Sequence, residues 1–214
     1  MDSRFLHGLG IKHMTDKASH VYHDMSYLDI YDRHFASIRH DVRCLIEIGV
    51  LNGGSLRMWR EYFPNATIVG VDINPDVIQY HSERIDIVIG DQNDEHFLND
   101  LCSKYNNPDI VIDDGSHITS HQIKTFNHIH PIMAKIGFYV IEDLRNSYEE
   151  IANHHDLRKI WPGMAYNRES DALKNYREDL DHWIKQKVKD LDFHNDNKIF
   201  GIYHYPMILM IENR

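Results

Sequence analysis

The sequence predicts an α/β protein with a doubly wound, mostly parallel sheet of seven strands and a C-terminal antiparallel hairpin. Five short apolar runs alternate with segments of helical periodicity, which is the pattern of a parallel sheet covered by helices on both faces. A glycine-rich turn follows the first run, and two further apolar runs flank Tyr205-Pro206. Right-handed crossovers leave few other arrangements. At 214 residues and 42% hydrophobic content we expect one domain, residues 1–214.

The first part of the chain, residues 1–40, is expected to form a helical cap. Apolar side chains recur at helical spacing from Met25 to Ile38, so we expect an amphipathic helix that closes the edge of the sheet. The alternative is a lid over the cofactor or the substrate, formed by Thr15, Asp16 and Lys17.

The remaining elements follow in order along the chain. Strands are expected at 44–50, 67–72, 85–91, 109–114 and 137–143, and helices at 56–63, 93–105, 120–134 and 172–191. The tail, 198–212, is expected to form the hairpin. Residues 146–171 have no clean period and follow a strand with acidic residues at its end, so they form a candidate acceptor-binding loop.

Composition excludes several classes of protein. A net charge of −10 argues against a basic surface for nucleic acid. Two cysteines cannot build a disulfide framework, the first 17 residues do not resemble a signal peptide, and no apolar run is long enough to span a bilayer. We therefore expect a cytoplasmic protein with no nucleic-acid partner and no membrane span. The aromatic N-terminal helix offers an interface for a homo-oligomer.

The glycine-rich turn points to the cofactor. Glu47-x-Gly49-x-x-x-Gly53-Gly54 is wider than the G-x-G-x-x-G turn of dinucleotide-binding proteins, and it lacks the Gly-Lys-Ser/Thr of a triphosphate site. The acid at Glu47 would repel a pyrophosphate but suits an ammonium or a sulfonium, which favours S-adenosylmethionine over NAD. Asp72 lies about 20 residues beyond the turn, where an acid meets a ribose diol. Asp91 ends the next strand.

Two acidic motifs mark the candidate catalytic centre. The apolar run that begins at Asp109 leads into Asp113-Asp-Gly-Ser-His117, and the strand at 137–143 ends in Glu142-Asp143. If these strands are neighbours, their carboxylates share one pocket and need a cation. Oxygen ligands suit Mg²⁺, and Mn²⁺ could replace it. His117 is a suitable proton acceptor, and Asp113 could orient a ligand instead of binding the metal.

Together the motifs resemble the class I S-adenosylmethionine-dependent methyltransferases, with their Rossmann-like fold, over nearly the whole chain. The match is particularly close to the metal-dependent sugar O-methyltransferases of the macrocin and mycinamicin type. We expect the chain to lack the separate N-terminal domain of larger members. The residues that carry the resemblance are Thr15-Asp-Lys17, Glu47-x-Gly49-x-x-x-Gly53-Gly-Ser55, Asp72, Gly90-Asp-Gln92, Asp113-Asp-Gly-Ser-His117 and Ile141-Glu-Asp143.

The resemblance implies roles for individual residues. Asp114, Glu142 and Asp143 would ligate Mg²⁺, His117 would be the general base beside Asp114, and Asp72 would hold the ribose. Asp91 and Gln92 would lie by the adenine. The candidate cofactor-binding residues are Thr15, Lys17, Glu47, Gly49, Asn52, Gly53, Ser55, Asp72, Ile73, Asp91, Gln92 and Asp113.

The function predicted from these residues is a Mg²⁺-dependent transfer of a methyl group from S-adenosylmethionine to a sugar hydroxyl. The acceptor would be a glycan or a glycosylated natural product with vicinal hydroxyls. A catechol-like acceptor uses the same metal chemistry and stays an alternative. An NAD-dependent oxidoreductase or epimerase is disfavoured by the wide glycine turn and by the absence of a Tyr-x-x-x-Lys pair. A non-catalytic binding module would not need convergent acids and a histidine.

Overall fold

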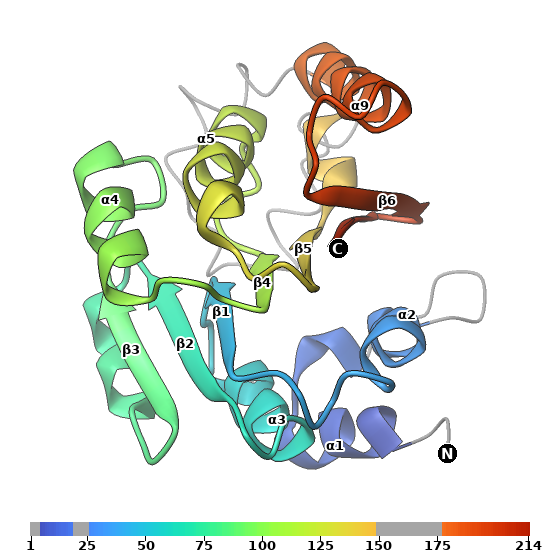
Figure 1. Ribbon diagram of the computed structural model, residues 1–214. Coiled ribbons are helices and arrows are strands. Elements are labelled where there is room, and N and C mark those ends of the chain that lie inside the picture. The colour runs from blue at the N-terminus through green and yellow to red at the C-terminus, as the bar shows by residue number, and fades with distance from the viewer. Residues whose placement is uncertain (1–4, 19–25, 149–176) are drawn as a thin grey trace.

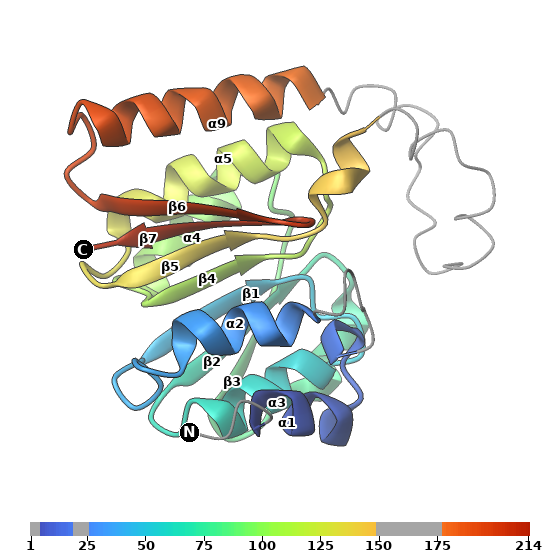
Figure 2. The same cartoon turned by 90° about the vertical axis from the view of Figure 1, so that its right-hand side faces the viewer.

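The computed structural model describes residues 5–18, 26–148 and 177–214. One seven-stranded sheet lies between two layers of helices (Figures 1 and 2). The strand order is β3-β2-β1-β4-β5-β7-β6, as expected for a doubly wound sheet that ends in a hairpin. The predicted fold class is therefore confirmed.

The strands lie close to the predicted ranges. Neighbours among β1 to β5 are parallel, whereas β7 is antiparallel to both β5 and β6. The strands are β1 Cys44–Ile48, β2 Thr67–Asp72, β3 Ile85–Ile89, β4 Ile110–Asp113, β5 Gly137–Ile141, β6 Ile199–Tyr205 and β7 Ile208–Asn213. The predicted turn between the last two falls between Tyr205 and Ile208, so the hairpin is confirmed.

Helices cover both faces of the sheet. Figures 1 and 2 show α1, α2 and α3 on one face and α4, α5 and α9 on the other. The helices are α1 Phe5–His13, α2 Tyr27–Phe35, α3 Gly54–Tyr62, α4 Glu95–Lys104, α5 Thr119–Ile129 and α9 Arg177–Asp192. Short 3-10 turns are η1 Asp16–Ala18, η2 Pro75–Tyr80, η3 His130–Ile132 and η4 Leu144–Ser147. Pro131 explains why α5 gives way to η3 before the predicted end at 134.

The core consists of two apolar layers, one on each face of the sheet. Successive side chains of a strand point to opposite faces. Leu45 accordingly packs with the layer under α1, α2 and α3, whereas Ile46 packs with the layer under α5 and α9. Ile110 and Val111 divide in the same way on β4. Burial on both faces explains why these strands are almost continuously apolar in sequence.

The N-terminal segment differs from the prediction in two respects. Residues 5–13 form a helix, α1, inside the region expected to be a helical cap, although no periodicity marked this particular helix. In addition, α2 lies on a face of the sheet and not at its edge, with the Tyr31 ring 5.4 Å from Trp59 and the Phe35 ring 5.5 Å from Phe138. Ser26 begins α2 with a capping box.

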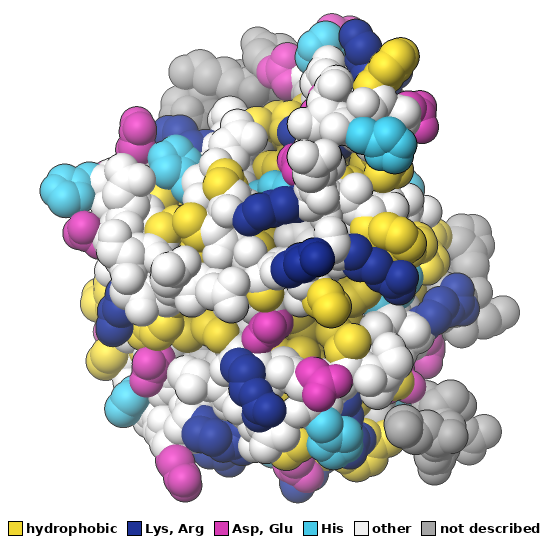
Figure 3. All heavy atoms as spheres, viewed as in Figure 1, with side chains coloured by type: hydrophobic (Ala, Val, Ile, Leu, Met, Phe, Trp, Pro, Cys, Tyr) yellow, Lys and Arg dark blue, Asp and Glu magenta, His cyan; other side chains and the backbone are white. Residues whose placement is uncertain are grey.

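Some predictions fall outside the described residues. Most of the candidate acceptor-binding loop, 146–171, lies there, as does the beginning of the helix predicted at 172. Cys44 and Cys102 are free and half-buried. Among the helices in 5–18, 26–148 and 177–214, none has the length and apolar character needed to cross a bilayer. On the face seen in Figure 3, basic, acidic and hydrophobic side chains are interspersed.

Candidate active site

Acidic residues meet where β4 and β5 end. The N–H of Asp114 donates to the carbonyl oxygen of Ile48 at 2.9 Å, which ties the end of β4 to β1. The N–H of Glu142 donates to the carbonyl oxygen of Asp113 at 3.0 Å, and Asp143 follows directly. Since β4 and β5 are parallel neighbours, both acidic motifs lie at the carboxyl edge of the sheet.

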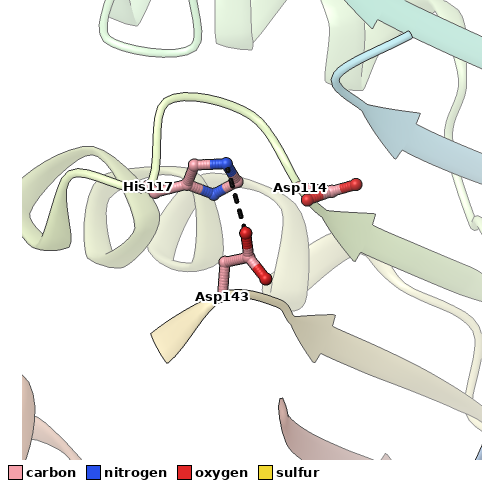
Figure 4. A group of neighbouring side chains, drawn as sticks. All are labelled: Asp114, His117 and Asp143. Atoms are coloured by element: carbon pink, nitrogen blue, oxygen red, sulfur yellow. Dashed lines mark ion pairs between the residues drawn. The ribbon is translucent and has the colours of Figure 1, made fainter. Parts of the chain in front are cut away.

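Two of these acids, together with a histidine, form a group that could hold a metal ion. Asp114, His117 and Asp143 each offer one ligand atom, and these atoms lie within 4.8 Å of one another. Nε2 of His117 is 3.8 Å from Oδ2 of Asp143, and Figure 4 shows the two side chains facing each other beside Asp114. His117 and Asp143 have left-handed backbones, with φ of 56° and 57°. Such conformations are costly for residues other than glycine and often mark functional sites.

Lys17 supplies a positive charge inside the same cluster. Its side chain is only 2% exposed, and its Nζ lies 2.5 Å from Oδ2 of Asp114 and 2.8 Å from Oε2 of Glu142. Oε1 of Glu47 is 3.3 Å away. Burial alone would lower the pKa of Lys17, but the three carboxylates raise it well above the ordinary value. Lys17 therefore stays charged.

Helix α2 contacts the carboxylate pair after β5. Tyr31 donates a short hydrogen bond to Oε1 of Glu142, and Tyr27 donates to Oδ1 of Asp143 at 2.7 Å. The tyrosines are four residues apart, so they share one face of the helix. Glu142, a predicted metal ligand, thus binds Tyr31 and Lys17 and lies outside the group in Figure 4. Sequence reasoning missed both tyrosines, and their spacing was the available signal.

The carboxylates differ in their readiness to ionise. Burial, together with mutual repulsion, raises the pKa of Glu142 well above its ordinary value. Burial also raises the pKa of Asp114, although Lys17 opposes it. For Asp143 burial acts in the same direction, but His117 and the hydrogen bond from Tyr27 outweigh it, so the pKa falls below the ordinary value. Asp143 is therefore the strongest acid of the three.

The glycine-rich turn lies beside this cluster. Glu47, on β1, is 0% exposed, and its Oε1 is paired with Nζ of Lys17 at 3.3 Å. Burial raises the pKa of Glu47 to about 7 although Lys17 opposes it. Gly49 has φ +95°, and a Cβ there would lie 2.1 Å from the carbonyl oxygen of Asp114. A buried carboxylate that shares its one lysine partner with two other acids, at such a turn, fits a positively charged ligand group.

Asp72, at the end of β2, holds the turn from the other side. Its Oδ2 accepts from the N–H of Val50 at 2.8 Å, and its Oδ1 accepts from the N–H of Asn74 at 2.9 Å. Ile73 is 61% exposed at the same strand end. Asp72 thus shapes the glycine turn, and its contact with a ribose stays a prediction.

Gln92 is buried and ties two loops together. Its Nε2 donates to both carboxylate oxygens of Asp113 at 3.1 and 3.2 Å, and its Oε1 accepts from the N–H of Ser116 at 2.7 Å. A Cβ at Gly115 would lie 2.2 Å from that Oε1. Burial raises the pKa of Asp113 to about 6. Both residues therefore support the loop that carries Asp114 and His117, whereas Asp91 is exposed.

The other predicted cofactor residues lie on the glycine turn or on the N-terminal segment. Thr15 is buried, and its N–H donates to the carbonyl oxygen of Gly10 at 3.1 Å, which closes α1. Oδ1 of Asn52 accepts from the N–H of Gly54 at 2.9 Å. The turn residues are Asn52, Gly53 (φ 67°, at the start of α3) and the buried Ser55.

Solved structures share this architecture. The MycE methyltransferase from the mycinamycin biosynthetic pathway, in complex with Mg and SAH, is 31% identical with a TM-score of 0.75, covering 98% of this chain and 55% of that chain. The same enzyme in complex with Mg, SAH and mycinamycin VI is 30% identical with a TM-score of 0.75, and the match covers 98% of this chain and 54% of that chain. A putative caffeoyl-CoA O-methyltransferase from Staphylococcus aureus, at 14% identity and a TM-score of 0.58 over 100% of this chain and 92% of its own, supports the fold alone. The chain has the fold of the class I S-adenosylmethionine-dependent methyltransferases.

Curated proteins with similar sequences indicate which kind of methyltransferase this chain resembles. Demethylmacrocin O-methyltransferase of Streptomyces fradiae is 40% identical over 152 residues, 68% of this chain and 35% of that protein. A tetracenomycin rhamnosyl 2'-O-methyltransferase of Streptomyces olivaceus is 39% identical over 67% of this chain and 38% of its own length. Mycinamicin VI 2''-O-methyltransferase of Micromonospora griseorubida is 41% identical over 63% of this chain and 32% of its own length. No family model matches.

The chain is a homologue of the sugar O-methyltransferases of the macrocin and mycinamicin type, so the predicted resemblance is confirmed. It matches less than two-fifths of the length of each of these curated relatives.

Proposed function

We propose that the chain transfers a methyl group from S-adenosylmethionine to a sugar hydroxyl of a glycosylated natural product or a glycan, with the help of Mg²⁺ or Mn²⁺. The observation that carries the proposal is the group of Asp114, His117 and Asp143 beside the glycine turn. Two relatives are named as O-methyltransferases, one of a rhamnosyl tetracenomycin and one of demethylmacrocin, which favours a methyl transfer over the NAD-dependent alternative. A single domain at 1–214, a cytoplasmic location and a homo-oligomer stay predictions.

The residues around the turn fit the cofactor. The buried carboxylate of Glu47 shares the ammonium of Lys17 with Asp114 and Glu142, and an ammonium on the methionine part of the cofactor would give it a second positive partner. Each oxygen of Asp72 accepts one backbone hydrogen bond and has capacity for another, so a ribose diol can bind without breaking the turn. Asp91 and Gln92 follow β3 and are proposed to lie by the adenine.

The acidic residues fit a hard divalent cation. Asp114, Glu142 and Asp143 offer the oxygen ligands that Mg²⁺ prefers. When bound there, the cation would lower the pKa of a hydroxyl of a vicinal diol. Asp143 has the lowest pKa of the three, so it is charged and ready to bind. Glu142 must share its carboxylate with Lys17 and Tyr31.

His117 is the proposed proton acceptor for the hydroxyl. Its Nε2 lies 3.8 Å from Asp143, whose negative charge would stabilise the imidazolium formed by proton uptake. Gln92 and Asp113 hold the loop that carries His117 in place. The methyl group would then pass from the sulfonium sulfur to the deprotonated oxygen in a single displacement that releases S-adenosylhomocysteine, and the protein would chiefly supply alignment.

The test is an acceptor panel. The purified chain is incubated with S-adenosylmethionine, Mg²⁺ and either deoxysugar glycosides with vicinal hydroxyls or simple catechols, and S-adenosylhomocysteine is quantified. We expect product with glycosides. Product with catechols alone would establish the alternative acceptor, and absence of S-adenosylmethionine binding in calorimetry would overturn the proposal.

A substitution tests the proposed role of His117 as proton acceptor. His117→Ala should abolish turnover while leaving S-adenosylmethionine affinity within about twofold, because the residue acts on the acceptor. His96→Ala, which changes an exposed histidine on α4, is the matched control. Equal loss of affinity and turnover in the His117 variant would mean that His117 is structural.

A further inference from the structure

Lys17 joins three strands through one buried ammonium. Its partners are Glu47 on β1, Asp114 after β4 and Glu142 after β5, at 3.3, 2.5 and 2.8 Å. The side chain is 2% exposed, so these carboxylates replace nearly all the water around the charge. A buried charge is tolerated only when it is paired in this way.

Two of these partners are also proposed metal ligands. Asp114 belongs to the group with His117 and Asp143, yet its Oδ2 is the closest oxygen to Lys17. Oε2 of Glu142 accepts a hydrogen bond from the ammonium of Lys17. Glu47 is the one partner of the three that is not a proposed ligand. A divalent cation bound by Asp114 and Glu142 would therefore lie close to the ammonium of Lys17. Both positive groups would contact the same carboxylate oxygens.

Resting on the proposed metal site, we propose that Lys17 is a positioning residue that competes with the divalent cation for Asp114 and Glu142. Without the cation, the ammonium holds together two carboxylates that would otherwise repel each other. When the cation is bound, the ammonium stays paired with Glu47, and its contacts with Asp114 and Glu142 weaken. Lys17 thus lowers the affinity for the cation while keeping the ligands assembled.

The experiment is a calorimetric titration of Mn²⁺ into three chains. Native protein should bind one ion per chain. Lys17→Met should bind Mn²⁺ at least about tenfold tighter, because a unit charge near a divalent ion repels it strongly even at an effective dielectric constant of about 20. Lys12→Met is the matched control. It removes a lysine whose ammonium is 2.7 Å from the exposed Glu61, away from the cluster, and should leave the affinity unchanged.

The outcomes separate the two proposals. If native protein binds no Mn²⁺, the proposed metal site fails and the inference falls with it. If native protein binds Mn²⁺ but folded Lys17→Met binds it equally or more weakly, only the competition by Lys17 is refuted. Should Lys17→Met fail to fold by circular dichroism, Lys17→Gln gives the neutral side chain with an amide that can still donate to Glu142. Lys17→Arg, which keeps the charge, should stay within about threefold of native affinity.

Discussion

The buried carboxylate of Glu47 makes the protein less stable than it would be with a neutral side chain. The side chain is fully buried, and its Oε1 lies 3.3 Å from the ammonium of Lys17, which Asp114 and Glu142 share. Replacement by the isosteric amide in Glu47→Gln removes the charge and keeps the shape. We therefore expect this variant to be more stable than native protein at alkaline pH, at the expense of cofactor binding.

The size of the effect follows from the pKa. Burial raises the pKa of Glu47 from 4.5 to about 7, with the opposing attraction of Lys17 already included. At about 1.4 kcal/mol per pH unit, the ionised carboxylate lowers the free energy of unfolding by about 3 kcal/mol. Since the folded pKa lies above the unfolded one, this loss develops as pH rises from about 4.5 to 7 and is complete above that.

Urea denaturation without ligands at pH 8 and pH 5 measures this difference. Glu47→Gln should exceed native stability by about 2–3 kcal/mol at pH 8 and by less than about 1 kcal/mol at pH 5. Glu61→Gln, which removes an exposed carboxylate, should stay within about 0.5 kcal/mol at both. The reasoning is refuted if Glu47→Gln is less stable than native protein at pH 8, because the pair with Lys17 would then outweigh the cost of burial.

Two further predictions concern hydrogen bonds near the site. Tyr27→Phe removes the donor to Asp143 and should weaken Mn²⁺ binding about tenfold, since groups that orient a metal ligand typically contribute that much. Tyr62→Phe, whose hydroxyl contacts Asp32 instead, is the control, and identical Mn²⁺ titrations for both variants would contradict the prediction. Asp72→Ala should weaken S-adenosylmethionine binding by calorimetry without altering the Mn²⁺ titration. Normal cofactor affinity there would exclude the ribose role.

Much of the fold could be predicted because the strands alternate with helices and end in recognisable turns. The hairpin was predictable from two apolar runs around Tyr205-Pro206. Helix α1 was not, because Phe5–His13 contains two glycines and no clear apolar stripe. It is stabilised by packing, with Leu6 and Leu9 buried in the layer under α2 and α3.

The acids of the candidate site were predictable because they follow two apolar strands, and the structure makes those strands, β4 and β5, neighbours. Their partners were not, because Lys17 and Tyr31 belong to segments whose position depends on tertiary packing. No local pattern says that a lysine in a polar stretch will be buried among carboxylates. Likewise, the backbone conformation of His117 and Asp143, which decides the group that forms, cannot be read from residue spacing.

The position of β7 between β5 and β6 has a consequence for synthesis. β5 is complete once residue 141 is made, but its partner on that side ends at residue 213. At roughly 5–20 residues per second, β5 waits about 4–14 s with an unpaired apolar edge. The N–H of Leu144, just beyond the acidic pair, also awaits the carbonyl oxygen of Met207. The acidic end of β5 can thus assemble fully only after β7 has been synthesised.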